Sequence, residues 1–95
     1  MSIEFLSNED GVVSIRQVKA ARSLLAWSQG DLAKASGISE PTIARLESQD
    51  GELGGRADTA AKIIAALESA GVIFVEENGE GPGVRLRRNS GSVPV

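Results

Sequence analysis

Three serine residues, each placed to begin a short helix, constrain the fold of this chain more than any other feature. Ser14, Ser28 and Ser39 each follow an apolar residue and precede a second apolar residue by four positions. A hydroxyl there accepts a hydrogen bond from a free backbone N–H of the first turn, and the two apolar side chains pack on each other. Gln17 completes a capping box with the first serine. The pattern predicts three short consecutive helices.

The spacing of apolar residues sets the length of these helices and adds a fourth. We predict helices over residues 15–26, 29–36, 40–48 and 57–70. Gly37 and Gly71 suit the left-handed backbone that ends a helix, and Pro41 fits only in a first turn. The residues expected to face the core are Ile15, Val18, Ala21, Leu25, Leu32, Ala33, Ile43, Leu46, Ala60, Ile63, Ile64 and Leu67.

A β-hairpin is predicted after the helices, because two β-rich runs flank a glycine-rich turn. The fold class is therefore mainly α, with a four-helix domain over residues 13–71 and a C-terminal hairpin over residues 72–88. An isolated hairpin is marginally stable in water, so we expect a third strand to cover its exposed apolar residues. These residues are Val72, Phe74, Val84 and Leu86. The strand would come from residues 3–6 or from the hairpin of a second copy.

The remaining segments and the composition carry further expectations. Residues 1–12 are predicted to be a loose arm or an edge strand, and residues 89–95 a disordered tail. The chain has no Cys and no His, so it has no disulfide, Cys/His zinc site, thiol nucleophile or imidazole base. We expect no enzyme activity, no cofactor and no metal. The longest apolar run is too short for a membrane span and the start is acidic, so we expect a cytoplasmic protein.

Residues 29–48 have the layout of a helix-turn-helix: two short helices joined by a tight turn at Gly37. Ile43 and Leu46 lie three residues apart and are expected to hold the second helix to the first. The outer surface of that second helix is short and polar, which suits the width of a DNA major groove. This surface consists of Glu40, Pro41, Thr42, Ala44 and Arg45.

Over residues 15–71 the chain resembles the XRE family of bacterial helix-turn-helix regulators, the class of the lambdoid repressors and Cro. The matching residues are Ala21, Arg22, Trp27 to Ala33, Gly37 to Ser39 and Thr42 to Glu47. The resemblance implies a four-helix Cro/repressor-like domain that binds double-stranded DNA. It implies DNA contacts by Gln29, Ser39, Glu40, Pro41, Thr42 and Arg45, and a structural pair of Arg22 with Glu47. We add Ser28, Lys34 and Arg56 as predicted phosphate contacts.

The charge of the chain does not favour binding to nucleic acid. The net charge is −3, and residues 28–56 carry five acids (Asp31, Glu40, Glu47, Asp50, Glu52) against three bases (Lys34, Arg45, Arg56). Because phosphate neutralisation supplies most non-specific affinity, a monomer is expected to bind weakly. We therefore expect a homodimer on a near-palindromic operator, with its recognition helices about 34 Å apart. The predicted function is a sequence-specific transcriptional regulator, most simply a repressor. The alternative is a protein-interaction module on the same scaffold, of the antiactivator or antitoxin kind.

Overall fold

A computed structural model describes residues 13–87 of the chain. Four helices are followed by a two-stranded antiparallel sheet, which confirms the predicted fold class. The elements are α2 (Ile15–Leu24), α3 (Gln29–Ser36), α4 (Glu40–Glu47), α5 (Ala57–Ser69), β1 (Val72–Val75) and β2 (Gly83–Leu86). The predicted arm, the last residue of the predicted hairpin and the predicted tail lie outside the described residues.

The three serines begin three helices, as predicted. The hydroxyl of each accepts a hydrogen bond from the backbone N–H three positions further on. These bonds join Gln17 to Ser14, Asp31 to Ser28 and Thr42 to Ser39. In α2 and α3 the side chain at the third position also accepts from the backbone of the capping serine, so both helices have a complete capping box.

The first helix ends at Leu24, so the prediction that it extends to residue 26 is wrong. Ala26 adopts a left-handed φ of 58°. The N–H of Ala26 bonds to Ser23 O at 3.0 Å, and the N–H of Trp27 bonds to Arg22 O at 2.9 Å. These two bonds form the Schellman arrangement that ends many helices. Glycine is the usual signal for it, and an alanine gives none.

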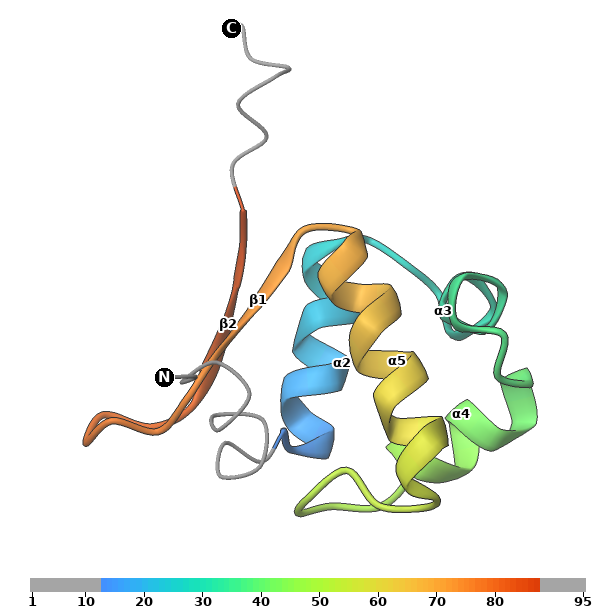
Figure 1. Cartoon of the computed structure of the whole chain (residues 1–95), viewed down its shortest axis with the longest axis horizontal. Coiled ribbons are helices and arrows are strands. Elements are labelled where there is room, and N and C mark those ends of the chain that lie inside the picture. Colours follow the sequence, from blue (N-terminus) through green and yellow to red (C-terminus); the bar gives the residue numbers. More distant parts are fainter. Residues whose placement is uncertain (1–12, 88–95) are drawn as a thin grey trace, which may run out of the picture.

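The elements form three layers, with α2 and α5 in the middle (Figure 1). The hairpin packs against one side of this middle layer, and α3 and α4 pack against the other. The core fills the spaces between the layers. Its fully buried residues include Val18, Ala21, Leu32, Ile43, Leu46, Ile63, Leu67 and Val72.

Four apolar residues of the hairpin were predicted to be exposed, and this prediction is wrong for three of them. Val72 is 1% exposed, and Phe74 and Val84 pack against the core. Helices α2 and α5 cover this face of the sheet, so no third strand is needed to bury it. Leu86 is 42% exposed, as predicted.

A buried amide fixes the hairpin to α2. The side-chain oxygen of Gln17 accepts the N–H of Ser14 at 2.9 Å. Its Nε2 donates to Gly83 O at 2.8 Å and to Val75 O at 3.3 Å. Gln17 therefore completes the predicted capping box and also bonds two strand carbonyls, and only the second role has no signal in the sequence.

The segment after α4 is anchored to the start of α2. The N–H of Ile15 donates to Gly51 O at 2.8 Å, and the N–H of Leu53 donates to Val13 O at 2.9 Å. Leu53 also packs against the core. This segment lies between two helices and has no regular secondary structure, but these two hydrogen bonds hold it against the start of α2.

Candidate nucleic-acid interface

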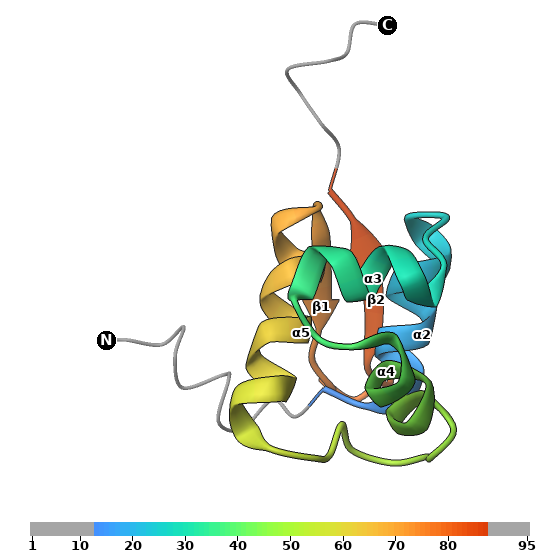
Figure 2. The same cartoon turned by 90° about the vertical axis from the view of Figure 1, so that its right-hand side faces the viewer.

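Helix α4 lies beside α3 (Figure 2). The side of α4 that faces away from the core is short and polar. On its inner side, Ile43 and Leu46 are 1% and 3% exposed. Thr42 is half-buried, and its hydroxyl oxygen accepts from the Ser39 hydroxyl at 2.9 Å. The exposed residues of α4 include Glu40, Pro41, Ala44 and Arg45. The inner side chains therefore fix which residues face outward.

Arg45 is exposed, and its guanidinium has no ion pair within residues 13–87. The ion pairs of the described part join Arg16 to Asp50, Arg22 to Glu47 and Arg56 to Asp58. An arginine side chain carries five N–H donors in a planar fork that matches guanine O6/N7 or a phosphate. Arg45 therefore offers these donors on the outer surface of α4.

A nearly buried ion pair holds α2, α3 and α4 together behind that surface. Arg22 donates to Glu47 through Nη2 at 2.7 Å and Nε at 2.9 Å, and its Nη1 donates to Trp27 O at 2.9 Å. Gln29 adds a bond to Glu47 Oε1 at 3.0 Å. Burial alone would raise the pKa of the Glu47 carboxyl, but the hydrogen bonds from Arg22 and Gln29, together with the positive charges of Arg22 and Lys19, outweigh it and lower the pKa. The pair that the resemblance implies is present.

The other predicted contact residues lie on α3 and before α5. Ser28 is the exposed N-cap of α3. Gln29 is half-buried and uses one amide N–H on Glu47, which leaves the second N–H. Lys34 is exposed in the last turn of α3. Arg56 precedes α5 and pairs with Asp58 in an exposed ion pair.

The structure brings the beginnings of α3 and α4 together through Glu40 and Gly30. A Cβ added at Gly30 would lie 3.3 Å from Glu40 Oε1. The carboxylate thus lies over the first turn of α3 and within the first turn of α4, where helix dipoles favour negative charge. A phosphate near Ser28 and Gln29 would have to approach this carboxylate. The sequence has no signal for this contact, because it depends on how two helices cross.

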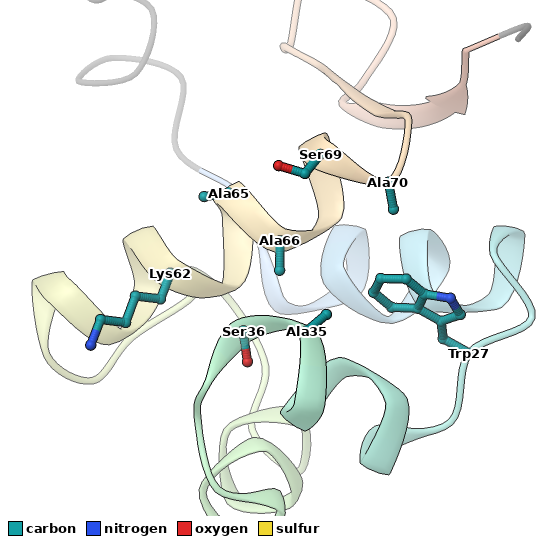
Figure 3. Close-up of a pocket in the computed structure, with 8 residues that line it drawn as sticks. All are labelled: Trp27, Ala35, Ser36, Lys62, Ala65, Ala66, Ser69 and Ala70. Atoms are coloured by element: carbon teal, nitrogen blue, oxygen red, sulfur yellow. The ribbon is translucent and has the colours of Figure 1, made fainter.

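A shallow groove of about 470 Å³ runs between α3 and α5 (Figure 3). Small side chains line most of it, with Trp27 at one end and Lys62 at the other. None of the predicted DNA contacts lines it, so it is separate from the outer surface of α4.

No helix within residues 13–87 is long and apolar enough to cross a membrane. The family profile for helix-turn-helix domains matches residues 18–69 of the chain. This span begins within α2 and ends with the last residue of α5. No curated protein matches the chain closely enough to serve as a named relative.

Proposed function

We propose, because this chain belongs to the XRE-type helix-turn-helix family, that it regulates transcription by reading a specific sequence of double-stranded DNA. The family is one of DNA-binding regulators. In our proposal α4 enters the major groove, and the bound protein represses by occupying an operator that overlaps a promoter.

The observation that carries this proposal is the exposed Arg45 on α4, whose guanidinium makes no ion pair within the described residues 13–87. A guanidinium that pairs with no carboxylate of the described residues can bond a base edge or a phosphate without first breaking such an ion pair. We propose that Arg45 reads a base and that its neighbours complete the contact. The proposed neighbours are Gln29, Ser39, Glu40, Pro41 and Thr42, with Ser28, Lys34 and Arg56 on phosphates.

A homodimer on a near-palindromic operator is part of the proposal. Residues 28–56 carry more acids than bases, so one protomer neutralises few phosphates. Two protomers double the base and phosphate contacts. The hairpin lies on the opposite side of the α2–α5 layer from α3 and α4 (Figure 1), so pairing through it leaves α4 accessible.

Substitution of Arg45 tests the proposal. The preferred duplex is first selected from a randomised DNA pool with the full chain, and fluorescence anisotropy then measures affinity. Arg45→Ala is expected to weaken binding by about 5- to 150-fold, which corresponds to roughly 1–3 kcal/mol for a lost base contact. Lys62→Ala removes the same charge from the exposed part of α5 and is expected to change affinity less than about twofold.

Thermal melts of both variants check that the fold is kept, since Ile43 and Leu46 hold α4 independently of Arg45. An unchanged affinity in Arg45→Ala, or no preference for any duplex, would contradict the proposal. The protein-interaction module would then be favoured, because Asp31 and Glu40 add exposed negative charge to the same surface.

A further inference from the structure

We infer that strand β1 forms the seam of the dimer. In this arrangement β1 pairs antiparallel with β1 of a second copy, and the two hairpins become one four-stranded sheet with both β1 strands at its centre. The inference rests on the homodimer of the proposed function and names the strand that forms it.

The register of the hairpin shows which backbone groups of β1 are free. The N–H of Arg87 donates to Gly71 O at 2.7 Å, so these two residues form a hydrogen-bonded pair at the open end of the hairpin. Bonded and non-bonded pairs alternate along an antiparallel ladder. Val72 and Phe74 therefore direct their backbone N–H and C=O groups to the outer edge of β1. No backbone group within residues 13–87 bonds to them there.

The two edges of the sheet differ in charge. The β2 side carries the exposed side chains of Arg85 and Arg87, and charged side chains are the usual means by which proteins keep a sheet edge from pairing. Strand β1, from Val72 to Val75, is apolar throughout. It is the edge without protection, and an unprotected apolar edge pairs readily with another strand.

The outer face of the sheet favours the same seam. Ile73 and Val75 are half-buried and belong to the set of side chains opposite to the core-facing Val72 and Phe74. Pairing of two β1 strands would bring Ile73 and Val75 of both copies together as apolar neighbours across the seam. Pairing of two β2 strands would instead bring arginines of both copies close to one another, and like charges in neighbouring strands repel.

The position of the hairpin is compatible with DNA binding by both protomers. Figures 1 and 2 show the sheet on the far side of α2 and α5 from α3 and α4. A seam at β1 therefore covers no residue of the outer surface of α4. It supplies the second set of contacts that the low positive charge of one protomer requires.

Ile73→Glu tests the seam while keeping the hairpin. The cross-strand partner of Ile73 is Arg85, so the new carboxylate faces a guanidinium within its own hairpin. In the dimer, carboxylates of two copies would meet. Sedimentation equilibrium of the full chain is expected to show a wild-type dimer and a dissociation constant raised by about 30-fold or more in Ile73→Glu. Arg85→Gln is the control and is expected to leave the dimer unchanged.

A charge-swap experiment sharpens the result. The double variant Ile73→Lys with Arg85→Glu keeps opposite charges on these two cross-strand partners. At the seam it carries a positive charge, where Ile73→Glu carries a negative one. Mixing it with Ile73→Glu is expected to restore association as a heterodimer, while each variant alone is monomeric. Melting curves confirm that all variants are folded.

A monomeric wild type, a dimer that survives Ile73→Glu, or a mixture that does not associate would each overturn the β1 seam. Anisotropy with the selected duplex separates this failure from failure of the proposed function. A monomer that still binds the duplex specifically overturns the seam and the homodimer but leaves the proposed reading of DNA by α4 in place. A dimer that prefers no duplex overturns the DNA proposal alone.

Discussion

Arg22 and Glu47 lie at the centre of the junction of α2, α3 and α4. The guanidinium of Arg22 bonds both carboxylate oxygens of Glu47 and the backbone carbonyl of Trp27. The side chains of Arg22 and Glu47 are only 19% and 5% exposed. Little water reaches either charge, so each is stabilised mainly by its oppositely charged partner.

We predict that Arg22→Ala and Glu47→Ala each lower the free energy of unfolding by about 3 kcal/mol, because either change leaves a buried charge without its partner. The double variant should lose less than the sum of the two, since it leaves neither charge behind. Urea unfolding of the four proteins measures the cycle. Strict additivity would contradict the coupling.

The same pair gives stability a pH dependence with a definite sign. Burial opposes ionisation of Glu47, but the bonds from Arg22 and Gln29 prevail, so its folded pKa lies below its ordinary value of 4.5. A lowered folded pKa contributes stability that is present above the unfolded pKa and is lost as pH falls through the folded pKa. The difference in unfolding free energy between wild type and Glu47→Gln should therefore shrink as the pH is lowered below about 4.5.

Contacts between individual side chains were predictable only where a local sequence motif or the family resemblance indicates them. The resemblance implies the partnership of Arg22 with Glu47, and the structure forms the ion pair. The position of Glu40 over Gly30 was not predictable, because residues on two helices meet there only after the helices have packed. The sequence shows a glycine in the first turn of α3, but it does not show that the Glu40 carboxylate occupies the space beside that glycine.

At the scale of elements, helix starts were predictable and one helix end was not. The starts of α2, α3 and α4 each carry their own signal, a serine whose hydroxyl caps the first turn, whereas α5 begins after Arg56 without a side-chain cap. The end of α2 depends on a left-handed alanine, Ala26, which Arg22 helps to hold through its bond to Trp27 O. The hairpin itself was predicted from its β-rich runs, but its covered face depends on α2 and α5, which no local pattern reports.

Gln17 is the element-scale contact that can be tested most directly. Gln17→Ala removes the side-chain bonds to Val75 O and Gly83 O, so we predict a loss of about 2 kcal/mol in unfolding free energy. Native-state hydrogen exchange should show lower protection in β1 and β2 than in wild type. Gln49→Ala, at an exposed position after α4, is the matched control and should change neither quantity. Equal effects of the two substitutions would contradict the role of Gln17.

At the scale of the whole molecule, the distribution of charge limits how DNA affinity depends on salt. The proposed interface holds three bases per protomer, Lys34, Arg45 and Arg56, hence six in a dimer. Even if all six, Arg45 included, neutralised a phosphate, the slope of log affinity against log salt would be only about −5. We predict a slope no steeper than this in anisotropy titrations over a range of KCl concentrations. A steeper slope would show that basic residues elsewhere, such as Arg85 and Arg87, also reach DNA.

The amide of Gln17 and the buried side chain of Val72 both fall outside the span of the family match. The span matched by the family profile is therefore shorter than the part of the chain that packs into one core. An excised segment limited to residues 18–69 would lack the cap of its first helix and one wall of its core. In the proposed dimer, a substitution in the hairpin would abolish DNA binding by separating the two copies, although it changes no residue that contacts DNA.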